Sequence, residues 1–418
     1  MGRVSNRAMQ KNIPQDSVSL TRRRFLSGVG AATVTYTILA PQWAGAAETG
    51  PKIKVALLGA GGRGQWILKY FKEHGGYEIA GVFDYFEDRA KAAGDKYQVP
   101  ENMRFSGLYG YRKLLEKPVD AVIIQSPPYF HPEQAADAVD AGKHVYLAKP
   151  VAVDVPGCLS IAASGQKATQ KKLAFLVDFQ TRAHPSYQQA IRLVHEGKIG
   201  RIVCGEANYQ CSLYFASMDA RFRKDPKNPE ERLRAWAIDR VLSGDIITEQ
   251  NIHALDVASW VLNAEPIKAY GTGGKVRPFL GDCWDHFACI FYYPEGIILS
   301  FSSKQVGKGW DDIQCRIYGT EGTLDTHYGG PVRLHCDDAY NGGTTNTIYE
   351  LGVQNNVRTF YESIAKGDFS NPTVAPSVRS NLVTILGRTA AYKNTEITWA
   401  QMMKAREKWV FDTKGLKS

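Results

Sequence analysis

The sequence has no closely spaced cysteines. Its seven cysteines are scattered singly through 418 residues, and none forms a C-x-x-C pair or has the spacing of zinc ligands. A structural metal site is therefore not expected, and the odd number of cysteines leaves at least one thiol unpaired within the chain. Most of these side chains are expected to be buried as small apolar groups.

Two further patterns are missing: an apolar run long enough for a membrane span and a basic run interleaved with aromatic residues. The uncharged stretch at residues 28–40 is shorter than the roughly 20 residues that a span needs. No cysteine directly follows it, so no stable membrane or lipid anchor is predicted. Part of the net charge of +9 lies in the N-terminal segment, and the rest is expected to be a solvated surface. Nucleic acid is therefore not an expected partner.

The overall composition is that of an ordinary soluble globular protein. Hydrophobic residues make up 44% of the sequence and charged residues 22%, which excludes a disordered or collagen-like chain. A length of 418 residues exceeds what one hydrophobic core usually organises, so two domains are predicted.

The first 46 residues resemble a twin-arginine signal peptide. Residues 21–27 read TRRRFLS, an uncharged stretch follows at residues 28–40, and an A-G-A cleavage site ends at Ala46. The resemblance implies export to the periplasm by a route that carries folded proteins, often with a cofactor already inserted.

From residue 52 to about residue 180, short apolar runs alternate with helical patterns. Helical periodicity falls at residues 65–74 and 134–141. The apolar runs fall at residues 53–58, 77–83, 119–125, 144–147 and 173–177. Short apolar runs separated by helices indicate a parallel sheet covered on both faces. The first domain is therefore predicted to be of the α/β class.

A glycine-rich turn lies between the first apolar run and the first helical pattern. It reads G-A-G-G-R-G and matches G-x-G-x-x-G. Glycines in this context let the backbone approach a pyrophosphate, whose charge is met by free N–H groups and by the positive end of the helix dipole. The predicted cofactor-binding residues of this loop are Gly59, Gly61, Gly62, Arg63 and Gly64.

Asp84 ends the next apolar run, about 20 residues beyond the last glycine of the loop. A carboxylate in this position would hydrogen-bond a ribose hydroxyl of a dinucleotide. It would also repel a 2′-phosphate, so NAD is the predicted cofactor. NADP remains possible if Arg63 or Arg89 reaches the ribose.

Residues 119–153 carry a family resemblance. They read VDAVIIQSPPYFHPEQAADAVDAGKHVYLAKPVAV. The P-P turn, the histidine after it, the A-G-K-H-V strand and the Lys-Pro pair resemble the Gfo/Idh/MocA family of oxidoreductases. The resemblance extends from about residue 52 to the C-terminal helical region. The chain departs from the family at Ala148, where a glutamate is usual.

The resemblance implies functions for three residues of this stretch. Pro127 and His131 are expected at the cofactor, and Lys149 is expected to face both the nicotinamide and the substrate. Judged from its position alone, a lysine at the carboxyl end of a strand can equally be a solvated surface residue.

Residues 244–263, which read GDIITEQNIHALDVASWVLN, form a second signature. Glu249, His253 and Asp256 stand at i, i+4 and i+7 and would share one face of a single helix. The resemblance implies that an acid and a histidine face the substrate here, with the histidine as acid/base and a glutamate in place of the more usual aspartate. With Lys149, these three are the predicted catalytic residues, and the two acids would orient the substrate or tune the histidine. The alternative for His253 is a core histidine bonded to a neighbouring residue such as Asp256.

Beyond residue 200, the apolar runs predict a second domain of the α+β class. They fall at residues 201–210, 267–276, 287–293, 296–303 and 314–318 and are typical of a mixed or mostly antiparallel sheet. The resemblance implies that one face of this sheet is open and pairs with another subunit, so a homo-oligomer is expected.

Two residues are predicted to bind the substrate. Relatives often place an arginine near the substrate at the position of Arg182, and the ring of Trp236 is suited to stack on a sugar. Each has a structural alternative, a surface position for Arg182 and a core or interface position for Trp236.

The predicted organisation has four parts. A signal peptide occupies residues 1–46, and a Rossmann NAD-binding domain occupies residues 51–180. A substrate and oligomerisation domain follows at residues 181–355, and residues 356–418 form C-terminal helices and a tail that pack back on the domains.

Together these features predict an exported NAD(P)-dependent oxidoreductase that acts on a sugar or sugar-like alcohol. Because no free dinucleotide pool is expected outside the cytoplasm, the cofactor should stay bound and be regenerated in place. Relatives imply two routes: a second substrate accepts the hydride, as in glucose–fructose oxidoreductase, or the hydride returns to the same sugar after an elimination, so that the net reaction is glycoside hydrolysis. A non-catalytic sugar-binding protein with a vestigial dinucleotide site is a third alternative, because Ala148 replaces the family's glutamate.

Overall fold

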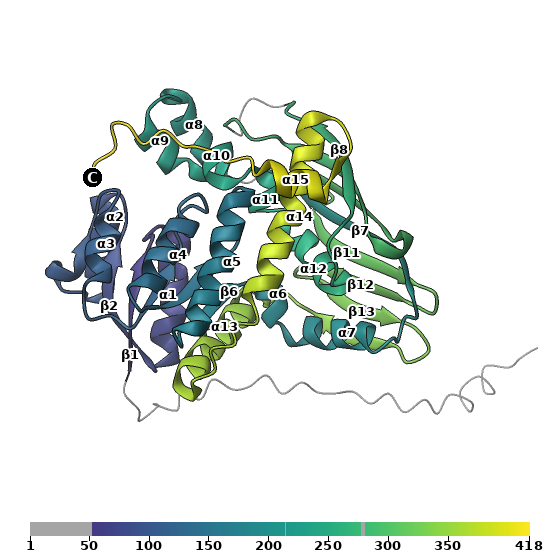
Figure 1. The fold of residues 1–418 in the computed structure, drawn as a ribbon, viewed down its shortest axis with the longest axis horizontal. Coiled ribbons are helices and arrows are strands. Elements are labelled where there is room, and N and C mark those ends of the chain that lie inside the picture. Colours follow the sequence, from purple (N-terminus) through teal and green to yellow (C-terminus); the bar gives the residue numbers. More distant parts are fainter. Residues whose placement is uncertain (1–51, 214, 277–280) are drawn as a thin grey trace, which may run out of the picture. The chain divides into compact units, whose positions relative to one another are not determined.

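The computed structural model describes residues 52–213, 215–276 and 281–418, which all belong to one unit of the chain (Figure 1). The predicted signal peptide at residues 1–46 and the predicted start of the first domain at residue 51 lie outside the described residues.

The first half of the described chain forms a six-stranded parallel sheet in the order β3-β2-β1-β4-β5-β6. β1 pairs with β2 on one side and with β4 on the other, so the strand order reverses at β1. In α/β sheets, ligands bind at such a switch point, beyond the carboxyl ends of the strands. The strands are β1 (Ile53–Leu58), β2 (Tyr77–Phe83), β3 (Arg104–Phe105), β4 (Ala121–Ile124), β5 (His144–Ala148) and β6 (Phe175–Asp178).

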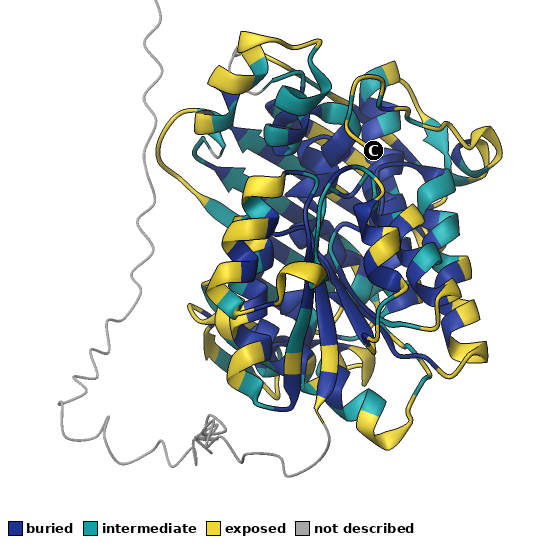
Figure 2. Ribbon diagram, turned by 90° about the vertical axis from the view of Figure 1, so that its left-hand side faces the viewer, coloured by how far each residue is buried: buried dark blue, intermediate teal, exposed yellow. Residues whose placement is uncertain are grey.

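Helices cover both faces of this sheet. Val55 and Leu57 of β1 pack on one side with α1 and α2, whereas Ala56 and Leu58 pack on the other side with α3, α4 and α5. Strands buried on both faces read as continuous apolar runs, and in Figure 2 most of this sheet is dark blue. The helices are α1 (Gly62–His74), α2 (Glu87–Tyr97), η1 (Glu101–Met103), α3 (Gly110–Leu115), α4 (His131–Asp140) and α5 (Val155–Gln170).

The second half forms a nine-stranded sheet in the order β14-β13-β12-β11-β7-β10-β9-β8-β15. β10 and β7 pair in parallel, and the other neighbouring pairs are antiparallel. This confirms the predicted fold class, a Rossmann part followed by a mixed, mostly antiparallel sheet. The strands are β7 (Ile202–Cys211), β8 (Lys268–Gly274), β9 (His286–Tyr292), β10 (Ile298–Gln305), β11 (Asp312–Gly319), β12 (Thr323–His327), β13 (Pro331–His335), β14 (Tyr340–Thr344) and β15 (Ile397–Thr398), with the turn η3 (Pro294–Gly296) between β9 and β10.

One face of the second sheet packs on helices α7 (Pro185–His195), α12 (Ile252–Leu262) and α14 (Val374–Lys393). The side chains on the other face are partly exposed, and several are charged. Arg316 Nη1 lies 2.8 Å from Glu206, and Arg316 Nη2 lies 3.0 Å from Asp325, so charges of both signs are paired across neighbouring strands.

Two long helices connect the two sheets. Helix α13 (Ile348–Lys366) packs on α1 and β6, and α14 packs on α5, α12, β8 and β9. After β15 and α15 (Trp399–Ala405), residues 406–418 run as an extended tail, the yellow segment that ends at C in Figure 1. We call these last residues the C-terminal strap.

A helical segment connects β7 to β8. In Figure 1, α8, α9 and α10 lie at the same end of the molecule as the C-terminal strap. The elements are α8 (Ala216–Lys224), α9 (Pro229–Arg234), η2 (Trp236–Ile238), α10 (Arg240–Ser243), α11 (Ile246–Glu249) and α12.

The single helix expected to carry Glu249, His253 and Asp256 is in fact two helices. Helix α11 ends at Glu249 and α12 begins at Ile252. The Asn251 N–H donates to the carbonyl oxygen of Ile246, five residues back, which closes α11 with a wide turn before a new helix starts. The expected common helical face was therefore wrong for Glu249, and its position relative to His253 is set by the turn.

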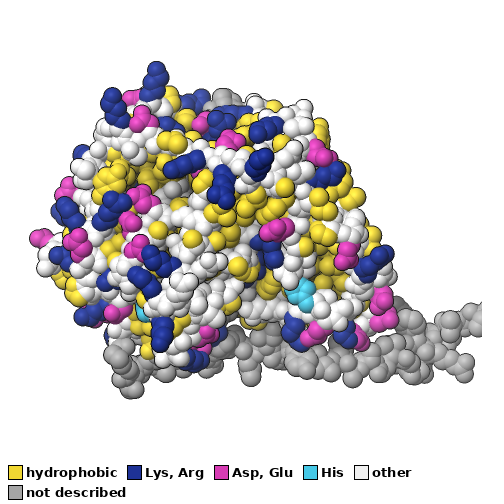
Figure 3. Space-filling model, in the orientation of Figure 1, with side chains coloured by type: hydrophobic (Ala, Val, Ile, Leu, Met, Phe, Trp, Pro, Cys, Tyr) yellow, Lys and Arg dark blue, Asp and Glu magenta, His cyan; other side chains and the backbone are white. Residues whose placement is uncertain are grey.

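The cysteines, possible metal ligands and surface charges of the described residues can be compared with the sequence expectations. All seven cysteines are unpaired and five are buried. Within the described ranges, no helix is long and apolar enough to cross a membrane, and no group of three or more His, Cys, Asp or Glu side chains is placed to hold a metal ion. On the face drawn in Figure 3, Lys and Arg side chains are interspersed with Asp and Glu.

Candidate active site

The glycine-rich loop connects the carboxyl end of β1 to α1. Its glycines are required for different steric reasons. A Cβ on Gly59, whose φ is +99°, would lie 2.5 Å from the backbone nitrogen of Ser126, and a Cβ on Gly64 would lie 1.9 Å from the Gly59 carbonyl oxygen. Both glycines are therefore required for backbone packing. A Cβ on Gly61 would meet Arg89 Nη1 alone, at 3.8 Å. The open space at Gly61, beside the N-terminus of α1, fits a pyrophosphate.

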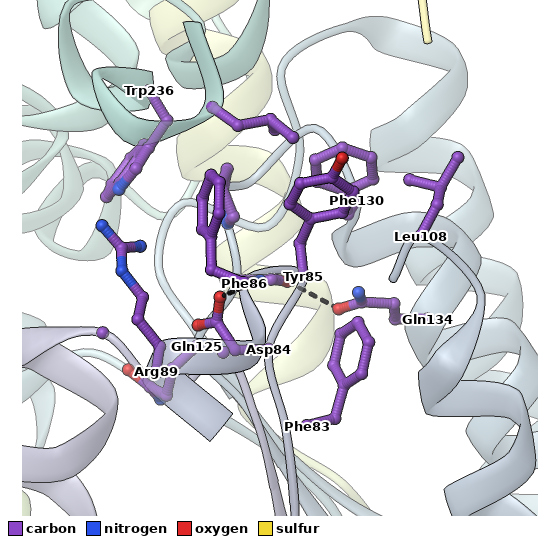
Figure 4. A pocket seen from close by; sticks show the side chains of 15 residues that line it. Phe83, Asp84, Tyr85, Phe86, Arg89, Leu108, Gln125, Phe130, Gln134 and Trp236 are labelled. Atoms are coloured by element: carbon purple, nitrogen blue, oxygen red, sulfur yellow. Dashed lines mark hydrogen bonds between the residues drawn. The ribbon is translucent and has the colours of Figure 1, made fainter. Parts of the chain in front are cut away.

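A small cavity lies beside the loop (Figure 4). We call it the Asp84 cavity. The buried Asp84 carboxylate accepts hydrogen bonds from the backbone N–H groups of Ala60, at 2.8 Å, and Phe86, at 3.0 Å, and so joins the loop to the turn after β2. Burial raises the pKa of Asp84, and these hydrogen bonds and the charge of Arg89 oppose the shift. The cavity is also lined by the predicted residues Gly59, Gly61, Pro127 and Trp236, and by Gln125.

Gln125 is a candidate cofactor residue that the sequence analysis missed. Its side-chain oxygen and nitrogen are both buried and have no hydrogen-bond partner among the described residues. An unpaired buried amide is costly, so a polar ligand in the Asp84 cavity would satisfy it. The open space at Gly61 and the unpaired amide of Gln125 both fit a dinucleotide. The signal in the sequence was a polar residue at the end of the apolar run 119–125.

The order of strands in the first sheet places the other site groups in a row. Along the carboxyl edge stand Asp84 after β2, the glycine loop after β1, Gln125 after β4 and Lys149 after β5. Neighbouring strands lie about 4.8 Å apart, so Asp84 and Lys149, three strands apart, are separated by roughly 14 Å along this edge. A dinucleotide bound along this edge with its adenosine at Asp84 would extend toward Lys149.

Lys149 contacts a residue from the second half of the chain. Its Nζ donates to the main-chain oxygen of Glu249, at 2.5 Å, and lies 3.2 Å from Glu249 Oε1. The two side chains are 15% and 10% exposed, so solvent screens this ion pair less than a surface pair. The structure thus brings two of the predicted catalytic residues together, although they lie 100 positions apart in the sequence.

His253 lies in the first turn of α12 and is buried. Its Nδ1 has no hydrogen-bond partner within the described residues, and its ring centroid is 5.0 Å from that of Tyr328. Burial lowers the pKa of His253 well below its ordinary value, and the positive charges of Lys149 and Arg63 lower it further. The imidazole is therefore neutral at neutral pH, which is the form that accepts a proton.

Asp256 contacts Arg182 and not His253. Arg182 Nε lies 3.0 Å from each Asp256 carboxylate oxygen, and Nη2 lies 2.8 Å from Oδ1. The Asp256 side chain is completely buried, and a buried carboxylate needs a counter-charge close by. This pairing corrects two expectations: that Asp256 tunes His253, and that the two residues bond to each other in the core. The pair instead joins α6 (Gln180–Ala183) to α12 and so positions the helix that carries His253.

His131 is held by main-chain groups, and Trp236 lines the Asp84 cavity. The ring nitrogens of His131 lie 2.8 Å from the carbonyl oxygens of Pro150 and Ser126, so the ring joins the turn after β4 to the segment after Lys149. Trp236, a predicted substrate residue, lines the Asp84 cavity, and Figure 4 shows the Arg89 side chain extending toward its ring. This placement puts Trp236 at the Asp84 end of the edge.

Asp178, at the end of β6, is a site residue that the sequence analysis did not single out. Its buried carboxylate accepts hydrogen bonds from Arg63 at 3.3 Å, Gln180 at 3.1 Å and Asn356 at 2.8 Å. Arg63 is thereby held at the end of the edge where it lowers the pKa of His253. The signal was an acid that terminates a buried strand.

Two family descriptions match the chain, one for each half. Residues 53–178 match an oxidoreductase family with an NAD-binding Rossmann fold, and residues 187–325 match the GFO/IDH/MocA C-terminal domain. The chain belongs to the Gfo/Idh/MocA family of NAD(P)-dependent oxidoreductases. The family resemblance, the enzyme class and the NAD-binding fold expected from the sequence are thereby confirmed.

Individual members of the family are similar over most of their length. The inositol 2-dehydrogenase of Rhizobium meliloti (strain 1021) is 24% identical over 357 residues, which cover 82% of this chain and 96% of the relative. The aldose-aldose oxidoreductase from Caulobacter crescentus, solved with glycerol, has a TM-score of 0.67 and 20% identity and covers 83% of this chain and 99% of its own. Levoglucosan dehydrogenase, solved with NADH and levoglucosan, has a TM-score of 0.66 and 18% identity over 84% of this chain and 100% of its own. At these identities the two structures show the shared fold.

We expect Asp84→Asn to reduce the preference of this Gfo/Idh/MocA oxidoreductase for NAD over NADP. The amide keeps one acceptor oxygen, so one of the two backbone hydrogen bonds is lost, and it removes the charge that would repel a 2′-phosphate, while Arg89 lines the same cavity. The ratio of the two dissociation constants should change by about tenfold, which corresponds to about 1.4 kcal/mol. Equilibrium binding of NAD and NADP to the apo-protein measures it, with the exposed Asp95→Asn on α2 as a control. An unchanged ratio would show that the carboxylate does not act on the ribose.

Proposed function

We propose that this chain oxidises a carbinol carbon of a sugar or sugar-like alcohol, with a nicotinamide dinucleotide bound along the carboxyl edge of the first sheet. The observation that carries the proposal is the buried His253, whose Nδ1 has no hydrogen-bond partner among the described residues, together with the Lys149–Glu249 pair. Oxidation of an alcohol needs a base for the hydroxyl proton and a cation for the developing alkoxide. We assign the base to His253 and the cation to Lys149, which follows β5 at the end of the edge where the nicotinamide is expected.

Each residue has a defined part in the reaction. A bound nicotinamide supplies the acceptor for the hydride. His253 takes the proton of the substrate hydroxyl, and Lys149 stabilises the charge that develops on the substrate oxygen. Glu249 orients the Lys149 ammonium through its carbonyl and carboxylate oxygens, so the cation is held in place before the substrate binds. In the reverse direction His253 returns the proton.

A polyhydroxy substrate fits the polar groups near these residues. Buried side-chain oxygens of Gln250 and Asn251, in the turn before His253, have no partner among the described residues. The same holds for Gln180 and Thr181 of α6. Unpaired buried oxygens are costly, and hydroxyl groups of a ligand would satisfy them. These groups support a sugar or a cyclic polyol as the substrate class.

We further propose that the cofactor stays bound and that a second sugar regenerates it. The predicted export supports a closed cycle, since no free dinucleotide pool is expected outside the cytoplasm. One similar structure is that of an aldose-aldose oxidoreductase. Hydrolysis of a glycoside through transient oxidation, and sugar binding without catalysis, are the two alternatives.

The proposed function is tested by the contents and the optical response of the purified protein. Denaturation should release about one NAD(H) per chain, identified by mass and absorbance. Addition of single sugars to the native protein should then produce the absorbance of reduced nicotinamide without added cofactor. A protein that binds no dinucleotide would contradict the proposal. Release of sugar from glycosides only when NAD is present, without a lasting change in absorbance, would favour the hydrolytic alternative.

Export by the twin-arginine route, domain boundaries at residues 180 and 355, and a homo-oligomer also belong to this proposal. The face of the nine-stranded sheet that helices leave uncovered is the proposed contact surface between subunits. It carries both apolar and charged side chains, which suits contact with an identical surface. Among them are Tyr270, Ile290, Ile298 and the paired charges of Arg316, Glu206 and Asp325. The molar mass in solution tests it.

A further inference from the structure

The Asp84 cavity has a wall that comes from the second half of the chain. Leu233 and Trp236 line it together with Asp84 and the glycine loop. They belong to residues 229–243, which contain α9, η2 and α10 and which we call the roof segment. The adenosine half of the cofactor site therefore lies between the Rossmann turns on one side and the roof segment on the other (Figure 4).

The roof segment is attached to the turn after β2, next to Asp84. The Tyr85 hydroxyl donates to Glu230 Oε1 at 2.7 Å. The Arg234 guanidinium lies 3.8 Å from the ring centroid of Phe86, and Arg234 Nη2 lies 3.4 Å from Asp88. Two polar contacts and one cation–π contact thus hold the roof segment against the turn that carries Asp84.

The C-terminal strap crosses the same place. The Lys417 N–H donates to the Tyr85 hydroxyl at 3.0 Å, and the Leu108 N–H donates to the Lys417 carbonyl at 2.7 Å. The Phe411 N–H donates to the Tyr129 hydroxyl at 3.2 Å. Burial raises the pKa of Tyr85 to about 12, so its hydroxyl stays protonated and donates to the roof while it accepts from the strap.

An apolar cluster joins the three parts. Phe411 of the strap is 2% exposed and packs in one cluster with Leu233 and Leu242 of the roof segment and Phe86 of the turn after β2. Trp236 packs against this cluster. Figure 1 shows the strap running past α10 and α9 to end beside α2 and α3. The roof is therefore held from one side by the Rossmann turns and from the other by the strap.

We propose that the roof segment and the C-terminal strap form a clasp that retains the dinucleotide, with Trp236 as a cofactor contact contributed from outside the Rossmann fold. This inference rests on the proposed function, because it assumes that the Asp84 cavity holds the adenosine. The adenosine leaves when the roof moves away from the turn after β2, and that movement breaks the hydrogen bonds of Tyr85 and withdraws the apolar side chains around Phe411. Release is therefore slow, which suits an enzyme that regenerates its cofactor in place.

The rate of cofactor release tests the clasp. The full chain, Tyr85→Phe and a chain that ends at Thr413 are loaded with NADH and gel-filtered, and release is followed by the loss of NADH fluorescence after excess NAD is added. Tyr85→Phe removes the hydroxyl shared by roof and strap. The shortened chain removes the Lys417 bonds and leaves Phe411 in place. Lys404→Ala, at an exposed position on α15, is the control.

We expect about one NADH per chain to survive gel filtration in the parent and in Lys404→Ala, and about tenfold or more faster release in both clasp variants. Unchanged thermal unfolding would show that the variants fold. Release at the parental rate from folded Tyr85→Phe and the shortened chain would overturn the clasp. Rapid exchange in the parent, with sugar oxidation supported by added NAD, would also overturn it and leave the proposed function intact. Failure of the parent to bind NADH at all would instead contradict the proposed function.

Discussion

His253→Ala should slow the sugar-dependent reduction of the bound cofactor by about a hundredfold or more. Removal of a positioned acid/base typically costs roughly 10²–10⁴ in rate. The glycine loop and Asp84 are untouched by this change, so the cofactor content should stay close to one per chain. Single-turnover absorbance of reduced nicotinamide measures the hydride step without a second substrate. Lys149→Ala should give a loss of similar size, because it removes the cation that stabilises the alkoxide.

His335→Ala is a matched control, since His335 is exposed on β13 of the second sheet. It should retain the parental rate. If His253→Ala reduces its cofactor as fast as the parent, His253 is structural, and the acid/base must be sought at Glu249 or Tyr328.

The pH profile of the same single-turnover reaction separates a catalytic from a structural histidine. Because the pKa of His253 lies below its ordinary value, the neutral base persists on acidification, and the rate should fall at a lower pH than for an ordinary histidine. Lys149 and Arg63 contribute to that shift after burial. Arg63→Gln removes one of these charges and raises the pKa of His253. The fall in rate on the acidic side of the profile, its acidic limb, should therefore move to higher pH. A limb that does not move would show that His253 does not titrate in this step.

The second large effect is expected from Gly61→Val, which should abolish stoichiometric cofactor binding and leave the fold intact. Gly61 has a φ of −68°, which any residue adopts, and a Cβ there meets Arg89 Nη1 alone, at 3.8 Å. The protein itself therefore accommodates the side chain, whereas a pyrophosphate against the loop does not. The NAD(H) content after purification measures the effect, and thermal unfolding checks the fold.

Gly62→Ala is the control for the loop. Gly62 is one of the predicted loop residues, but it occupies an x position of G-x-G-x-x-G, where the motif allows a side chain, and a Cβ there meets nothing within 4 Å. Its contact with the cofactor would be made by the backbone N–H, which Gly62→Ala keeps. This variant should keep its cofactor. Retention of one NAD(H) per chain by Gly61→Val would show that the dinucleotide is bound elsewhere.

Much of the fold was predictable because burial leaves a periodic trace. β1 and β2 have the predicted bounds, and β4, β5 and β6 lie within a few residues of theirs, since strands covered on both faces appear as continuous apolar runs. β12, β13 and β14 were missed. They have one exposed face and sequences such as TLDTH and YNGGT, in which polar residues and glycines hide the alternation.

The candidate site was predictable where a local motif carries it. The glycine loop, Asp84 and Lys149 follow strands, and their positions were visible from the apolar runs that precede them. The partner of Asp256 was not visible, because Arg182 lies 74 positions away and no periodicity connects the two. The orientation of Glu249 was missed because the turn at Gln250 and Asn251 interrupts a pattern that reads as one helix.

By itself, then, the sequence determined the fold class, and it predicted the glycine loop and the groups proposed for alcohol oxidation, because each depends on neighbours within one strand, turn or helix. Only the tertiary structure decided which charges pair. It assigned Glu249 to Lys149 and Arg182 to Asp256, and it placed Trp236 at the Asp84 cavity and the strap against Tyr85. These contacts join positions about 70 to 330 apart in the chain. They form because buried charges and apolar side chains must find partners across the packed elements, and local sequence carries no record of which partner that is.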